Sequence, residues 1–156
     1  MIIFLDVDGV LNTPRCNGGI DEVLLTELHN SLHQAFPQGD FGIVMSSSWR
    51  EDMVNDFLSL THRPDLGISF KKNFIGVTPY LCTQPGLDPG KRSLEIHRWL
   101  ELTGYTSNRY IIIDDMPAWF DPQDVKSPNF VLVNGDLGFN KESSENLIRK
   151  AQQLQR

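Results

Sequence analysis

The sequence predicts an α/β fold, a doubly wound three-layer sandwich around a mainly parallel sheet. Short continuous apolar runs, typical of strands buried on both faces, alternate along the chain with segments of helical periodicity. Hydrophobic residues make up 40% of the chain, which is enough for a sizeable core. The 156 residues contain no internal repeat, low-complexity segment or linker, and a domain averages about 150 residues. We therefore expect one domain over residues 1–156.

The first half of the chain opens with an apolar run at residues 2–5, which predicts a buried strand. Asp21 is expected to cap a helix that ends before Pro37 and Gly39. Residues 41–45 predict a second buried strand. The three serines that follow it can cap a helix from about Trp49 to Leu60. Apolar residues recur at helical spacing along the first helix and form one face: Leu25, Leu28, Leu32 and Ala35.

The second half begins with an irregular, proline-containing segment at residues 61–90, inside which a strand is expected at 74–77. A helix is predicted from about Lys91 to Thr103, and residues 110–113 form the clearest strand of the chain. Another strand at 130–133 and a final helix at 142–154 follow. The side chains predicted to face inward are Leu94, Trp99 and Leu102 on the helix at 91–103. On the helix at 142–154 they are Leu147, Ala151 and Leu154.

Polar residues follow three of these apolar strands at the point where each strand ends. The first strand is followed by Asp6 and Asp8, the second by residues 46–48, and a later one by Asp114 and Asp115. Ligands of an open parallel sheet bind beyond the carboxyl ends of its strands, so these side chains should converge. Four clustered carboxylates repel one another unless a cation neutralises them. Because all the candidate ligands carry oxygen, the sequence predicts Mg²⁺.

The spacing of Asp6 and Asp8 suits the transfer of a phosphoryl group. Side chains two residues apart beyond a strand can share a face, and Gly9 permits the sharp turn that follows. One carboxylate can attack phosphorus to form an aspartyl-phosphate, while the other protonates the leaving oxygen and later deprotonates water. A serine hydroxyl can hold a phosphate oxygen, and a Lys or Arg usually offsets the developing charge. Asp and Gly are also common in plain turns, but three polar strand ends together favour a site.

These residues resemble a known family. Residues 6–12 (DVDGVLN) resemble the first motif, DxDGxL, of the haloacid dehalogenase (HAD) superfamily of phosphohydrolases. Ser46 resembles its second motif, a basic residue that opens a later helix resembles the third, and residues 111–115 resemble the fourth. The resemblance implies a HAD-like Rossmannoid fold. Further matches point to a small-domain branch associated with RNA-repair proteins: residues 47–50, 76–79, 95–96 and 99–100.

The resemblance also implies roles for individual residues. Asp6 would be the nucleophile and a Mg²⁺ ligand, and Asp8 the general acid/base, with its backbone carbonyl on the metal. Ser46 would hold the transferred phosphoryl group. Asp114 and Asp115 would complete the metal shell, directly or through water.

The third-motif cation has two candidates. Lys91 is favoured because a point charge suits a site shared by nucleophile and phosphate, whereas Arg92 is the better match if the branch alignment holds. Two further residues are candidates for contacting the substrate phosphate. Ser47 is equally suited to capping the next helix, and Arg50 is also consistent with a solvated residue of a first helical turn.

The substrate is bounded by length and charge. The insert at residues 13–20 and the segment at 61–90 leave no room for a large cap domain, and the resemblance then implies an open site that admits bulky substrates. A net charge of −6 weighs against tight nucleic-acid binding, because such binding depends on neutralising phosphates. A short basic set can still line one groove: Arg15, Arg50, Lys71, Lys72, Lys91 and Arg92.

The predicted function is a Mg²⁺-dependent phosphomonoester hydrolase that acts on nucleotide or polynucleotide terminal phosphates. The alternatives are a catalytically weak HAD-fold module that binds phosphoprotein or nucleic acid, and phosphoryl transfer to an acceptor other than water. The apolar N-terminal run is too short for a signal peptide, and Cys16 and Cys82 are read as reduced thiols. We therefore expect a cytoplasmic protein without membrane contact or an obligate protein partner, whose partner is its phosphorylated substrate.

Overall fold

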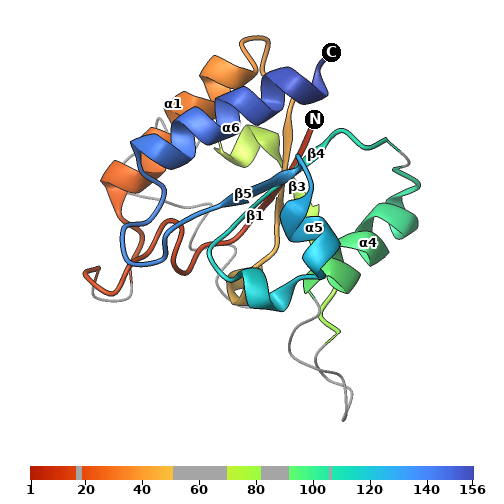
Figure 1. The fold of residues 1–156 in the computed structure, drawn as a ribbon, viewed down its shortest axis with the longest axis horizontal. Coiled ribbons are helices and arrows are strands. Elements are labelled where there is room, and N and C mark those ends of the chain that lie inside the picture. Colours follow the sequence, from red (N-terminus) through yellow and green to blue (C-terminus); the bar gives the residue numbers. More distant parts are fainter. Residues whose placement is uncertain (17–18, 51–69, 82–91, 106) are drawn as a thin grey trace.

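The structure is a computed structural model that describes residues 1–16, 19–50, 70–81, 92–105 and 107–156. Within these ranges the strands form a single five-stranded sheet in the order β3-β2-β1-β4-β5 (Figure 1). Every neighbouring pair is parallel, so the predicted α/β fold with a parallel sheet is confirmed. The strands are β1 (Ile2–Leu5), β2 (Gly42–Met45), β3 (Phe74–Val77), β4 (Tyr110–Asp114) and β5 (Phe130–Leu132).

Helices cover both faces of this sheet. In Figure 1, α1 and α6 lie side by side on one face, and α4 and α5 lie on the other. This arrangement confirms the predicted three layers. The helices with both ends inside the described ranges are α1 (Glu22–Ala35), α4 (Arg92–Thr103), α5 (Pro122–Lys126) and α6 (Lys141–Leu154), with 3-10 turns at η1 (Ser48–Arg50) and η2 (Pro117–Trp119).

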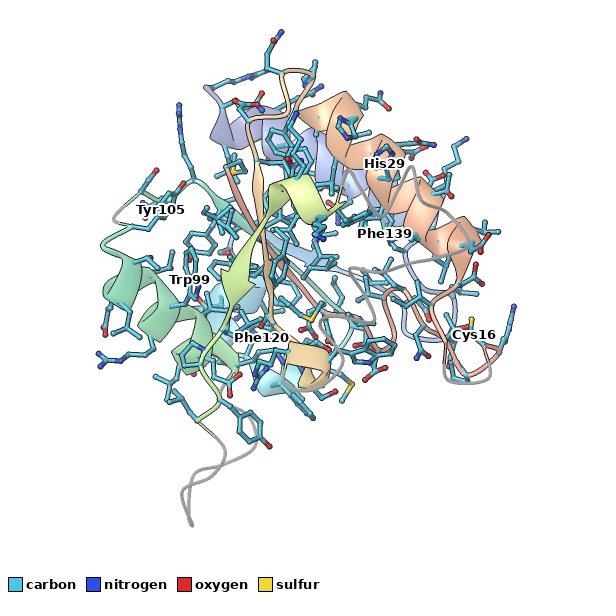
Figure 2. The ribbon with its side chains drawn as sticks, turned by 180° about the vertical axis from the view of Figure 1, so that it is seen from behind. Cys16, His29, Trp99, Tyr105, Phe120 and Phe139 are labelled. Carbon is cyan, nitrogen blue, oxygen red and sulfur yellow. The ribbon has the colours of Figure 1, made fainter. Side chains whose placement is uncertain are left out.

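The central strand β1 supplies both halves of the core because successive side chains of a strand point to opposite faces. Ile3 and Leu5 belong to the cluster packed under α1 and α6, whereas Ile2 and Phe4 belong to the cluster on the α4 side. All four are buried, as the continuous apolar run predicts. Figure 2 shows the same division, with Phe139 on the α1 side of the sheet and Trp99 and Phe120 on the α4 side.

The two long helices of the first face begin at polar caps. The carboxylate of Asp21 accepts hydrogen bonds from the backbone N–H groups of Val23 (2.8 Å) and Leu24 (3.4 Å), which confirms the predicted cap of α1. Asn140 caps α6 in the same way, and α6 begins at Lys141, one residue earlier than predicted. The predicted apolar faces are confirmed as well. On α6, Leu147 and Ala151 are buried and Leu154 is partly buried. On α1, all four predicted residues are buried: Leu25, Leu28, Leu32 and Ala35.

The predicted inner face of α4 is wrong in part. Leu94 and Leu102 are 43% and 64% exposed, and only Trp99 of the three predicted side chains packs inward, edge-on against Phe4 at 5.5 Å between ring centroids. The side chains that α4 buries are mainly polar: Arg92, Ser93, Glu95 and Ile96. Polar residues can face inward here because their partners are the carboxylates and loops at the end of the sheet.

Other elements differ from the expected boundaries or lie beyond them. A helix was expected from Trp49 to Leu60. The structure has the turn η1 at Ser48–Arg50, and residues 51–60 fall outside the described residues. The short elements η2 and α5 after β4 were not expected from the sequence. No helix in the described ranges is long and apolar enough to cross a lipid bilayer.

Candidate active site

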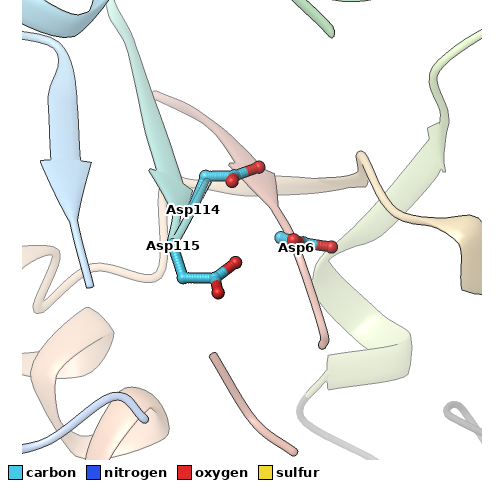
Figure 3. A group of neighbouring side chains, drawn as sticks. All are labelled: Asp6, Asp114 and Asp115. Carbon is cyan, nitrogen blue, oxygen red and sulfur yellow. The ribbon is translucent and has the colours of Figure 1, made fainter. Parts of the chain in front are cut away.

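Three carboxylates meet where β1 and β4 end. Asp6 follows β1, Asp114 is the last residue of β4, and Asp115 comes next (Figure 3). The two strands are hydrogen-bonded neighbours, so their ends meet at one edge of the sheet. One oxygen from each of the three carboxylates lies within 4.8 Å of the others. Asp6 and Asp114 are buried and Asp115 is half-buried, so the cluster is accessible from one side.

Arg92, the first residue of α4, joins two of these carboxylates. Its Nη1 atom lies 2.7 Å from Oδ2 of Asp6 and 2.6 Å from Oδ2 of Asp114. The guanidinium carbon also lies 4.7 Å from the centre of the Trp119 ring, which is a cation–π distance. Among the residues that the structure describes, Arg92 is therefore the cation that contacts these carboxylates. Lys91, the favoured candidate of the sequence, lies outside the described residues.

Burial makes the charge of this cluster costly. Desolvation, and then the proximity of Asp6, raise the pKa of Asp114 to about 8 and that of Asp115 to about 6. Desolvation also raises the pKa of Asp6, against the attraction of Arg92. Burial alone would lower the pKa of Arg92, but the two carboxylates outweigh this effect and raise it. One arginine thus compensates the acidic cluster only in part, and the cluster suits a further cation.

Asp8 lies apart from the cluster of Asp6, Asp114 and Asp115, and its carboxylate accepts three side-chain hydrogen bonds. The indole N–H of Trp49 donates to Oδ1 at 3.0 Å, and the Nδ2 group of Asn12 donates to the same oxygen at 3.2 Å. The hydroxyl of Ser48 donates to Oδ2 at 3.3 Å. Asp8 itself is exposed, so its carboxylate is oriented by neighbours and still open to a ligand.

Two glycines make room for the carboxylate of Asp115. Gly9 has a φ of 73°, which favours glycine, and a Cβ built there would overlap that carboxylate. A Cβ on Gly135 would overlap the same group. Close approach of the backbone to Asp115 is therefore a second reason for Gly9, besides the turn inferred from the sequence.

Two serines after β2, Ser46 and Ser47, differ in their contacts with the site. The side chain of Ser47 hydrogen-bonds to Asp6, and its Oγ accepts from the backbone N–H of Trp49 at 3.4 Å. The hydroxyl of Ser46 is buried and has no hydrogen-bond partner among the residues that the structure describes. A buried hydroxyl without a partner is unusual and is consistent with a group that a ligand completes.

Arg50 clamps this serine loop to α4. Its guanidinium pairs with Glu95 at 2.9 Å, donates to the backbone carbonyl of Ser47 at 2.9 Å, and lies 4.8 Å from the centre of the Tyr80 ring. Glu95 in turn accepts from the backbone N–H of Leu81 at 3.1 Å. Arg50 is 7% exposed, so the interpretation of Arg50 as a solvated residue of a first helical turn is wrong. It does not line the cavity described below, and its contact with phosphate stays a prediction.

We expect the substitution Glu95→Gln to destabilise the fold by about 2 kcal/mol, because a hydrogen bond to a charged group is worth about 1.5–3 kcal/mol and Arg50 would lose its counter-charge. Urea unfolding of the variant measures the change. Glu101→Gln is the matched control, since Glu101 pairs with Arg98 on the exposed side of α4 and should matter by less than about 1 kcal/mol. Equal effects of the two substitutions would contradict the clamp.

The described residues form a cavity of about 250 Å³ beside Asp6. A second cavity of about 460 Å³ shares Asp8, Gly9 and Asp115 with it. The smaller cavity is lined by Asp6, Asp8, Gly9, Ser48, Arg92, Asp115, Met116 and Trp119. Whether the site is uncapped, as the sequence predicts, depends on residues 51–69 and 82–91, which lie outside the described residues.

Four contributors to this site were not predicted as site residues from the sequence. Trp49 and Ser48 orient Asp8, Gly135 admits Asp115, and Trp119 packs on Arg92. Ser48 and Trp49 carried one usable signal, because they adjoin the second motif. Gly135 and Trp119 carried none, since only the tertiary fold places the segment after β5 and the turn η2 beside the strand ends.

Comparison with known proteins identifies a family for this chain. A search of curated proteins and a search of solved structures both find none. A family model described as the HAD domain in Swiss Army Knife RNA repair proteins matches residues 2–144, which include every motif residue discussed above. Since the match covers most of the chain, this protein belongs to that family of HAD domains.

Proposed function

We propose that the protein is a Mg²⁺-dependent phosphomonoester hydrolase that acts through an aspartyl-phosphate on Asp6. The observation that supports this most strongly is the placement of Asp6. It lies within reach of Asp114, Asp115 and Arg92 and lines the same cavity as Asp8. A nucleophile, a charge-balancing cation and a proton donor are the groups that such a reaction requires.

In the proposed reaction, an oxygen of Asp6 attacks phosphorus and the bond from phosphorus to the leaving oxygen breaks. Asp8 gives its proton to that oxygen, so the leaving group departs as a neutral alcohol. Asp8 then takes a proton from water, which attacks the aspartyl-phosphate and releases inorganic phosphate with Asp6 regenerated. The backbone N–H of Val7 donates to Oδ1 of Asp6 at 2.8 Å and, with Arg92, holds this carboxylate in one orientation.

Two other groups can serve the phosphoryl oxygens. Arg92 offsets negative charge on the transferred group, because a preorganised cation stabilises charge as it develops. The unpartnered hydroxyl of Ser46 can donate to a phosphoryl oxygen. We assign the third-motif role to Arg92 because of its contacts with Asp6 and Asp114.

The residues present fit a magnesium ion. The side chains of Asp6, Asp114 and Asp115 offer hard oxygen ligands, and the resemblance adds the backbone carbonyl of Asp8. When bound, Mg²⁺ would supply further positive charge to the phosphoryl group during its transfer. The raised pKa of Asp114 and Asp115 also fits a cluster that gains its full charge with a cation.

The substrates that we propose are nucleotide or polynucleotide terminal phosphates. The family description supports nucleic-acid chemistry, because it places such domains in RNA repair proteins. The test is phosphate release from a panel of small metabolites, mononucleotides, and oligonucleotides phosphorylated at the 3′ or 5′ end, with Mg²⁺ and with EDTA. Release that needs Mg²⁺ supports the proposal. Binding of Mg²⁺ and phosphate without hydrolysis across the panel would support a non-catalytic HAD-fold module instead.

Magnesium affinity is expected to rise with pH between about 5 and 8. The folded pKa of Asp115 (about 6) and of Asp114 (about 8) exceeds the ordinary value of 3.8. The metal-free folded state therefore binds more protons than the unfolded state, and its stability falls as pH rises through this window. Mg²⁺ must displace these protons, so binding at pH 6 to 7 should release protons that calorimetry in two buffers detects. Asp115→Asn should reduce the release, and affinity independent of pH would contradict the prediction.

A further inference from the structure

Trp119 and Met116 place apolar surface at the edge of a charged site. Both line the cavity with Asp6 and Asp8, and they are 38% and 41% exposed. They belong to the turn that follows β4, directly after the fourth-motif aspartates. An exposed aromatic side chain is informative where it adjoins a binding site, because its burial by a ligand is favourable.

Arg92 ties the Trp119 ring to the reacting carboxylate. The guanidinium that lies 4.7 Å from the centre of this ring also bonds to Asp6 at 2.7 Å. The ring therefore keeps a defined position relative to the nucleophile. Since the guanidinium covers one face, the exposed part of Trp119 is available to a planar group held next to the phosphate.

Charge distinguishes the two sides of the site. The larger neighbouring cavity is lined by the carboxylates of Asp8, Asp115 and Asp136, with Asn12 and Asn134. Such a wall repels the phosphates of a nucleic-acid backbone. The cavity lined by Trp119 and Met116 shares Asp8 and Asp115 and adds Asp6, but among the described residues it also contains the cation Arg92 and these two uncharged side chains. The organic part of the substrate is therefore better accommodated on the tryptophan side.

Size limits what the inner cavity takes. Ligand pockets usually measure about 300–1,000 Å³, and the cavity of about 250 Å³ that the described residues form lies just below this range. It suits the phosphate and the adjoining part of its ester. A base attached to that ester then reaches the rim, where Trp119 is exposed.

We infer that Trp119, with Met116 beside it, stacks on the nucleobase next to the scissile phosphate, so the substrate class is a nucleoside phosphate. This inference rests on the proposed hydrolase function and adds to it the residue that selects the base. Stacking on an aromatic side chain tolerates every base because each has a π-face, so we expect little preference among the four bases.

The test compares Trp119→Leu and Trp119→Phe with the native protein. The substrates are adenosine 5′-monophosphate, a 5′-phosphorylated trinucleotide and glycerol phosphate. Leu keeps apolar bulk but removes the aromatic face, so KM for the base-bearing substrates should rise about tenfold. Glycerol phosphate should change by less than about twofold, and Phe should restore most of the affinity. Leu94→Ala is the control, because Leu94 is exposed on α4 and does not line the cavity.

The outcomes separate the base contact from an effect through Arg92. A rise in KM for the mononucleotide, the trinucleotide or both supports the inference. It also shows whether the base that Trp119 contacts belongs to a free nucleotide or to an oligonucleotide end. An equal loss for all three substrates would show that Trp119 acts only by holding Arg92, and the inference fails. Thermal unfolding checks that each variant is folded.

A binding experiment keeps the inference separate from the proposed activity. If no substrate is turned over, the hydrolase proposal fails, and calorimetry with Mg²⁺ then compares adenosine 5′-monophosphate with inorganic phosphate. Tighter binding of the nucleotide that disappears in Trp119→Leu supports the base contact. Equal affinity of the native protein for the two ligands overturns it.

Discussion

Replacing Asp6 with Asn is expected to lower phosphate release by at least about 10³-fold, because the amide cannot attack phosphorus. The substitution keeps the shape of the side chain and its hydrogen bond from the backbone N–H of Val7. A steady-state assay with Mg²⁺ and the best substrate of the panel measures the loss. Asp6 is 3% exposed and its charge is opposed by burial, so the neutral variant should fold at least as well as the metal-free native protein.

The control for this variant is Asp40→Asn, which makes the same chemical change at an exposed carboxylate before β2. It should leave phosphate release within about twofold of the native rate, as expected of a surface substitution. Hydrolysis that survives in Asp6→Asn would contradict the covalent mechanism. If the proposed reaction occurs, acid quenching of the native protein during turnover should also trap phosphate on it, and Asp6→Asn should trap none.

Replacing Arg92 with Met is expected to destabilise the metal-free protein by about 3–5 kcal/mol at pH 8, because it leaves buried carboxylates without their counter-charge. Nη1 of Arg92 contacts both Asp6 and Asp114, and all three residues are buried. The penalty should shrink at pH 6. There Asp114, whose pKa is raised to about 8 with Arg92 present, is already protonated, so less negative charge is left without its partner. Urea unfolding at the two pH values measures both effects.

Arg98→Met is the matched control on the same helix. Arg98 pairs with Glu101 at 3.0 Å on the exposed side of α4, where ion pairs contribute about 1 kcal/mol or less. Mg²⁺ should restore part of the stability lost in Arg92→Met, since the cation supplies charge to the same carboxylates. Destabilisation of equal size at pH 6 and pH 8, unaffected by Mg²⁺, would contradict the electrostatic role of Arg92.

The sheet and its main helices were predictable because they follow from local pattern. A continuous apolar run such as residues 2–5 has a stable place only between two layers of helices, and both faces of β1 are buried. The cap at Asp21 is equally local, since its carboxylate bonds to N–H groups two and three residues later. Interactions within a few residues can be inferred from sequence, because the chain itself brings the partners together.

The inner face of α4 was not predictable for the opposite reason. Apolar periodicity favoured Leu94 and Leu102 as inward residues, yet the helix buries Arg92 and Glu95. Their burial is compensated by partners distant in sequence: Arg92 meets Asp6, and Glu95 meets Arg50. A buried charge is tolerated only with such a partner, and no property of the helix sequence reveals where that partner lies.

The carboxylates of the candidate site could be inferred from the sequence, because the polar residues that end each apolar strand lie at the same edge of a parallel sheet. This is why Asp6, Asp114 and Asp115 could be expected to meet. The contact of Arg92 with these carboxylates, the side chains that orient Asp8, and the surface that borders the cavity became known from the three-dimensional arrangement. Those contacts join segments that approach one another through the packing of layers, and their geometry exists only once the fold is complete.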